Sequence, residues 1–260
     1  MDSHPDAASE KPNQSIVSSY AVSIIPASVV KILSSVAAAL VLISITLQLL
    51  LLFGSTDIEW LVNFFDVNRE SNIPTFYSVF LLILSSILLL LITMLEKKRK
   101  AFHSWMWGIL AAGFLVLALD ELASFHEKLT YYVRIALDVK QMGILYLYGW
   151  VVPGTLIVLA AGFFFLRFWL RLPKKTRTFV AIAAVLYVGG AIGMEMAAGS
   201  YLAQTGKTDI SYNILATIEE ALEMGGIILF IHTLMAYIKG IYGEVRIQLG
   251  GADSETPEPR

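Results

Sequence analysis

The sequence predicts an all-α integral membrane protein, a bundle of six transmembrane helices with short interfacial elements in its outer loops. Hydrophobic residues make up 57% of the 260 residues, charged residues only 15%, and the mean hydropathy is +0.69. A soluble domain has about half of its residues apolar and about a quarter charged, so this chain is too apolar to be one. Its long apolar runs suit a bilayer instead, because about 20 apolar residues cross the hydrocarbon core.

The N-terminal part contains two of the predicted spans. Residues 1–28 are polar and rich in Ser and Pro, and we expect a disordered cytoplasmic tail there. The first apolar run covers residues 31–53. Residues 54–75 form an outer loop in which acids surround large aromatic residues, which is typical of a short interfacial helix or of an ordinary aromatic belt. The second run covers residues 77–95 and begins after Pro74, which favours a turn.

Four further runs complete the predicted membrane domain, residues 29–240. They cover residues 105–125, 150–169, 178–202 and 212–238. The Tyr-rich segment 128–149 predicts a second interfacial element. Residues 241–260 are polar and contain Pro and Glu, so we expect a second cytoplasmic tail.

Charge sets the orientation of the spans. Lys and Arg cluster in segments 96–100 and 167–177, and cytoplasmic loops carry such an excess of basic residues. The pattern predicts that both termini lie in the cytoplasm, in a cell (inner or plasma) membrane. Short basic clusters between apolar runs, with a net charge of −2, do not form a nucleic-acid surface, which excludes nucleic acid as a partner.

Carboxylates recur at one depth in three of the predicted spans. At about 1.5 Å per residue, the acids of run 105–125 lie roughly 7 Å, and the acid of run 178–202 roughly 10 Å, from the outer ends. The acids of run 212–238 fall at the same depth, and their spacing puts all three on one helical turn. In hydrocarbon such groups cost several kcal/mol each unless they are paired, protonated or metal-bound. The candidate metal ligands are Asp120, Glu121, His126, Glu127, Glu195, Glu219, Glu220 and Glu223.

Helical spacing refines this prediction. Asp120 and Glu127 would share one face of a continuous helix, with Ser124 between them. Glu195 is flanked by small residues that allow neighbouring helices to approach closely. The outermost residues also have explanations without a site. His126 and Glu127 would then lie at the water interface, and the acids at the start of the last run would lie in a helix entry that is exposed to water.

The charge balance leaves two states open. No Lys or Arg lies in these spans at that depth, so the acids are either protonated or neutralised by a bound cation. The chain has no Cys, which excludes disulfides and zinc–thiolate sites. Carboxylates with one imidazole, His126, suit a divalent ion such as Mg, Mn, Fe, Ca or Zn.

Three short motifs carry a resemblance to a known group. They are Glu70-x-Asn72-x-Pro74-Thr75, Asp120-Glu121-x4-His126-Glu127 and Glu219-Glu220-x2-Glu223. In this combination the chain resembles a group of prokaryotic polytopic membrane proteins whose members are uncharacterised. The resemblance spans roughly residues 65–230 and implies no activity.

Three functional hypotheses remain. The first is a metal-dependent membrane hydrolase or transferase, acting on a lipid-linked or periplasmic small molecule. The second is a cation- or proton-coupled transporter, and the third is a structural or sensory protein with a protonated acid cluster. A transport path needs polar groups in both halves of the membrane, yet the inner halves of runs 105–125 and 178–202 are almost wholly apolar. This favours a site that opens to one side of the bilayer.

Overall fold

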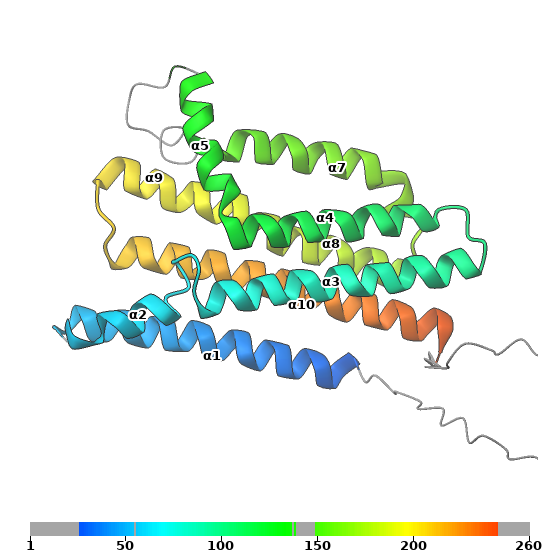
Figure 1. Ribbon diagram of the computed structural model, residues 1–260, viewed down its shortest axis with the longest axis horizontal. Coiled ribbons are helices and arrows are strands. Elements are labelled where there is room, and N and C mark those ends of the chain that lie inside the picture. Colours follow the sequence, from blue (N-terminus) through cyan, green and yellow to red (C-terminus); the bar gives the residue numbers. More distant parts are fainter. Residues whose placement is uncertain (1–25, 55, 137, 139–148, 244–260) are drawn as a thin grey trace, which may run out of the picture.

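A computed structural model describes residues 26–54, 56–136, 138 and 149–243 (Figure 1). Most of the two predicted tails, and residues 139–148 of the Tyr-rich segment, lie outside these ranges. The described part is all helical, as predicted. Its helices are α1 Pro26–Leu52, α2 Glu59–Phe65, α3 Ile73–Lys98, α4 Ser104–Ala123, α5 Phe125–Ala136, α7 Val151–Arg171, α8 Lys174–Val188, α9 Glu195–Thr205 and α10 Ile210–Tyr242; a 3-10 turn, η1, covers Thr56–Ile58, and a π-helix, η2, covers Gly189–Met194.

Five helical segments of the described chain are long and apolar enough to cross a membrane. They are α1, α3, α4, α7 and the continuous helix formed by α8, η2 and α9. Large apolar side chains cover their outer surfaces; Phe163 of α7, for example, is 84% exposed. A soluble protein does not expose so much apolar surface. The chain is therefore a multi-pass helical membrane protein.

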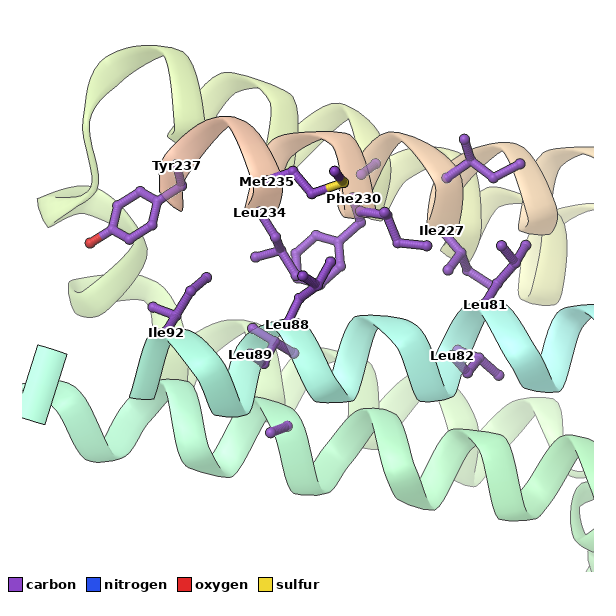
Figure 2. Packing of buried hydrophobic residues seen from close by; sticks show 14 of the residues in the cluster. Leu81, Leu82, Leu88, Leu89, Ile92, Ile227, Phe230, Leu234, Met235 and Tyr237 are labelled. Atoms are coloured by element: carbon purple, nitrogen blue, oxygen red, sulfur yellow. The ribbon is translucent and has the colours of Figure 1, made fainter. Parts of the chain in front are cut away.

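The helix α10 corresponds to the sixth predicted span and lies at the centre of the bundle. It is 33 residues long and contacts α1, α3, α8 and α9. The apolar side chains of α10 and α3 face each other, and Figure 2 shows Leu234 pointing toward Leu88 of α3. Ile231 and Leu234 of α10, and Leu81 and Ile92 of α3, are fully buried. Most residues of the buried apolar core therefore belong to α10 and α3.

Two glycines bring α8 and η2 unusually close to α10. A Cβ atom at Gly226 would lie 2.8 Å from the Tyr187 backbone nitrogen, and one at Gly190 would lie 2.9 Å from the Glu219 carbonyl oxygen. Only glycine fits such a contact between two backbones. This agrees with the close approach predicted around Glu195, and it sets the acids of α10 against the π-helix.

The two segments predicted to hold interfacial elements contain helices in their described parts. The short helix α2 lies between α1 and α3, and α5 follows α4. The predicted span 105–125 corresponds to α4, but the prediction that one helix continues to Glu127 is wrong, because Ser124 adopts a left-handed conformation (φ 49°) and ends α4 at Ala123. Asp120 and Glu127 therefore lie on two different helices, not on one face of a single helix.

The bundle has two chemically different ends (Figure 1). The acidic end carries the α2–α3 loop, the α4–α5 corner and the turn from α9 to α10. The basic end carries Pro26, the α3–α4 and α7–α8 turns and the end of α10, with Lys97, Lys98, Lys174 and Lys175. All of the candidate ligands lie toward the acidic end.

Candidate metal centre at the acidic end

A polar network fixes the loop between α2 and α3. The Asp66 carboxylate accepts hydrogen bonds from the Gln48 side chain (2.8 Å) and from the Asn68 backbone nitrogen (3.1 Å). The Asn72 side chain donates to the Asp66 carbonyl oxygen (2.6 Å) and caps α3 by accepting from the Thr75 backbone nitrogen (3.1 Å). Asp66, Asn72 and Thr75 are buried, so this loop is a rigid support for Glu70, which lies between them in sequence.

The corner between α4 and α5 orients His126. Asp120, in the last turn of α4, accepts a hydrogen bond from the His126 backbone nitrogen (3.0 Å), and its second oxygen lies 2.9 Å from His126 Nδ1. The left-handed Ser124 makes this contact possible, because it ends α4 and lets the chain begin α5 in a new direction. With Nδ1 held by a carboxylate, Nε2 is the nitrogen that remains for a ligand, an arrangement common among metal-binding histidines.

Three side chains converge where the loop meets the corner. Ligand atoms of Glu70, His126 and Glu127 all lie within 4.8 Å of one another, and no other such group of three occurs in the described parts of the chain. Two ligands of one ion lie at most about 4.4 Å apart, because each bond is about 2.0–2.2 Å long. The exposed carboxylates of Glu70 and Glu127 need to move only slightly to reach that distance.

Charge is concentrated at this group. Partial burial raises the pKa of the Glu70 carboxyl, and the neighbouring negative charge of Glu127 raises it further, against the lowering effects of His126 and of a hydrogen bond from Ser124. Burial lowers the pKa of His126, but the hydrogen bond and charge of Asp120, with the charges of Glu195 and Glu70, outweigh it, so the net shift is upward. The group attracts positive charge, which a proton or a metal ion can supply.

Glu195 is joined to this group through Trp150. The indole nitrogen of Trp150 donates to the Glu195 carboxylate (2.8 Å), and its ring lies 5.0 Å from the imidazole ring of His126. The Trp150 backbone nitrogen donates to the Thr130 hydroxyl (3.2 Å), which ties the start of α7 to α5. Glu195 therefore points into the bundle and toward the site.

The remaining predicted residues lie deeper, in a cluster that we call the inner acids: Glu121, Glu219, Glu220 and Glu223. Their carboxylates are close enough to repel one another; Glu223 interacts with Glu121 and Glu219, and Glu220 with Glu223 and Glu121. Glu121 also interacts with Glu70, His126 and Asp120, so it connects the inner acids to the converging group of Glu70, His126 and Glu127. Among the described residues, no hydrogen bond reaches any of the four inner side chains.

The structure therefore divides the eight predicted residues. His126 and Glu127 belong to the converging group, Asp120 orients His126, and Glu195 binds Trp150. Two participants, Glu70 and Trp150, were missing from the predicted ligand set. Glu70 belongs to the first motif of the resemblance, but no pattern in the sequence indicates how close its loop lies to α5.

One comparison with known proteins gives a match. A family model described as "Domain of unknown function (DUF8692)" matches residues 33–238. No curated protein and no solved structure matches the chain. The matched region contains the Glu70 loop, the α4–α5 corner and the inner acids, in agreement with the uncharacterised group that the motifs resemble. Since it covers well over half of the sequence, the chain belongs to this family of unknown function.

Proposed function

We propose that this protein binds one divalent transition-metal ion through Glu70, His126 and Glu127, and uses it for hydrolysis or group transfer at the membrane surface. The observation that carries the proposal is the convergence of these three side chains within 4.8 Å, from two separate pieces of backbone, the α2–α3 loop and the first turn of α5. Each piece has its own support: the Asn72 network holds the loop, and the Asp120 hydrogen bonds hold the first turn of α5.

The donor set narrows the choice of ion. Two carboxylates and an imidazole suit Mn²⁺, Fe²⁺ or Zn²⁺ better than Ca²⁺ or Mg²⁺, which prefer oxygen ligands alone. Three protein ligands leave coordination positions for water and for a substrate oxygen, as in hydrolytic metal sites. Asp120 has a positioning role, because it holds His126 and does not belong to the converging group.

The surroundings of the site favour a substrate that is held at the membrane interface. Glu70 and Glu127 are exposed at the end of the bundle, and α5 presents exposed apolar residues beside them, such as Tyr131 and Tyr132. Aromatic residues of this kind lie at the level of lipid headgroups. A lipid-linked molecule, or a small molecule from outside the cytoplasm, fits this position.

Elemental analysis of the purified full-length chain tests the proposal. We expect about one ion per chain in the wild type, and metal affinity about 10- to 100-fold lower after Glu70→Gln, Glu127→Gln or His126→Ala. Glu59→Gln changes an exposed acid of α2 outside the group and is the matched control. A wild-type protein that carries no ion and takes up none of Mn²⁺, Fe²⁺ or Zn²⁺ contradicts the proposal.

We also propose that the chain crosses the membrane six times, with α10 as the sixth span and both termini in the cytoplasm. The basic end would then face the cytoplasm and the metal site the outside, as the Lys and Arg distribution favours. A reporter that is active only outside the cytoplasm should give signal when fused after Phe65 or Lys207, and none after Lys98 or Lys175. Signal after Lys98 would place the metal site on the cytoplasmic side.

Cation transport is the second candidate, and one observation favours it. The inner acids lie between the converging group and the middle of the bundle, and Glu121 interacts with both sets. Transport predicts that the protein in sealed vesicles admits Mn²⁺ or Zn²⁺ to the lumen and that Glu223→Gln abolishes the flux. An enzyme predicts no flux, together with turnover that a chelator stops.

A further inference from the structure

A groove at the basic end lies between the first turn of α8 and the last turns of α10. It encloses about 380 Å³, a volume in the range of small-molecule sites. Its lining includes Lys175, Thr176, Phe179, His232, Ala236 and Ile241. The groove lies at the opposite end of the bundle from the proposed metal centre, so it requires a separate explanation.

Its polar end is built from the start of α8. Pro173 is the N-cap, and the first helical turn offers backbone N–H groups that have no partner within the helix. Thr176 lines the groove and is only 8% exposed as a residue, and no hydrogen bond of its hydroxyl occurs within the described ranges. Lys175 adds a positive charge at the same place. Free N–H groups, a hydroxyl and an ammonium group together suit a phosphate group.

The other end of the groove is apolar. Phe179 lies one turn further along α8, where its ring is nearly perpendicular to the His232 imidazole (6.3 Å between centroids). Ala236 and Ile241 form the facing wall on α10, and Gly240 leaves the groove open, because a Cβ there would meet nothing within 4 Å. Phe179 and Ile241 are 41% and 37% exposed, so the apolar part opens toward the surroundings of the bundle.

We propose that this groove binds one anionic phospholipid. Its phosphate lies at the first turn of α8, beside Lys175 and Thr176, and an acyl chain follows Phe179, Ala236 and Ile241. Charge complementarity selects this occupant: basic pockets between transmembrane helices bind anionic headgroups, and Lys174 adds to the positive charge. A soluble phosphate compound would leave the apolar part of the groove unfilled. The proposal is independent of the metal centre.

Native mass spectrometry of the detergent-purified full chain tests this proposal. The probes are phosphatidylglycerol and phosphatidylcholine with the same acyl chains, and glycerol phosphate, which has no acyl chain. We expect one phosphatidylglycerol to remain bound, with phosphatidylcholine at least about fivefold weaker and glycerol phosphate unbound. Equal binding of both lipids, or binding of glycerol phosphate alone, overturns the proposal.

Variants then locate the bound lipid. Lys175→Gln should weaken phosphatidylglycerol binding about fivefold, and Thr176→Val should weaken it by a smaller factor. Lys98→Gln removes an exposed charge at the same end of the bundle, away from the groove lining, and should have no effect. Gly240→Leu adds a side chain to the groove lining at a position where a Cβ meets nothing within 4 Å, so it should abolish binding without lowering the melting temperature in lipid-free detergent. Equal losses in Lys98→Gln and Lys175→Gln, or full binding by Gly240→Leu, would show that the lipid lies elsewhere.

Discussion

Two sets of buried or half-buried carboxylates, at opposite ends of the bundle, are stabilised in different ways. At the basic end Glu96 is 8% exposed, and one of its oxygens accepts hydrogen bonds from the hydroxyls of Tyr237 (2.8 Å) and Tyr242 (2.7 Å). At the acidic end Glu220 and Glu223 have other carboxylates as neighbours, and no hydrogen-bond donor within the described chain reaches them. The protein therefore satisfies the first carboxylate itself and leaves the others to depend on a proton or a cation.

This difference separates a structural role from a functional one. Glu96 connects the end of α3 to the end of α10, and the Arg99 guanidinium lies 5.4 Å from the Tyr242 ring centre beside it. Such a satisfied network holds two helices together. Repelling carboxylates do the opposite, because they destabilise the fold unless something neutralises them. Carboxylates retained without donors at one end therefore require protons or the cation that we propose.

The largest effect on stability should come from Glu96→Ala. The change leaves two tyrosine hydroxyls without their acceptor. An unsatisfied buried group costs about 1–3 kcal/mol, which applies in full to the buried Tyr237 and in part to the half-buried Tyr242, so we expect a loss of about 2–4 kcal/mol. Glu96→Gln keeps the accepting oxygen and should lose less than about 1 kcal/mol. Thermal unfolding in detergent, followed by circular dichroism, measures both. Equal melting temperatures for the two variants would mean that Glu96 does not hold α3 to α10.

The second-largest effect on stability should come from the close contact between α8 and α10, beside the inner acids. Gly226→Ala puts a Cβ 2.8 Å from the Tyr187 nitrogen and 2.9 Å from the Ala183 carbonyl oxygen, so α8 and α10 must separate. Overpacking of this kind costs about 1–3 kcal/mol. Gly225→Ala is the neighbouring control, because a Cβ there meets nothing within 4 Å. If the two variants unfold at the same temperature, the two helices are not in close contact at this point.

The sequence predicts most of this arrangement from a few physical rules. Hydropathy identifies the helices, and the cost of a carboxylate in hydrocarbon marks Glu195 and the inner acids as exceptional. Glycine near an acid indicates close packing, and Gly190 and Gly226 provide it. These properties are local, so a single sequence contains them.

The converging group of Glu70, His126 and Glu127 is less predictable from the sequence, because it depends on backbone turns between helices. The left-handed conformation of Ser124 brings His126 back to Asp120, whereas a continuous helix would carry the two apart. Glu70 reaches the group through a loop whose shape depends on Asn72 and on Gln48 of α1. Such contacts join distant segments, and helical periodicity within one segment contains no information about them.

The next effect should be a pH dependence of the metal affinity, because protons compete with the metal ion for His126. The pKa of His126 is raised above its ordinary value of 6.5, so the metal-free protein holds a proton there over a wider pH range. Metal binding requires the neutral imidazole, so affinity should increase with pH up to the raised pKa and decrease about tenfold for each pH unit below it. Titration with Mn²⁺ or Zn²⁺ at several pH values measures this, with Glu59→Gln as the control. A pH-independent affinity would exclude His126 as a ligand.

The smallest effect should come from Glu223→Gln, and it decides whether the inner acids hold the ion. In metal-free protein the change replaces a carboxyl group that needs a proton with a neutral amide, and it should raise stability by roughly 1 kcal/mol or less. If Glu70, His126 and Glu127 are the ligands, the variant also keeps its metal, because Glu223 lies outside the converging group. An ion bound only by the folded state stabilises that state. If the variant loses the ion and melts at a lower temperature in metal-containing buffer, a single site extending over all eight predicted residues is favoured instead. Elemental analysis and thermal unfolding with and without chelator distinguish these two outcomes, because they predict opposite signs for the change in stability when metal is present.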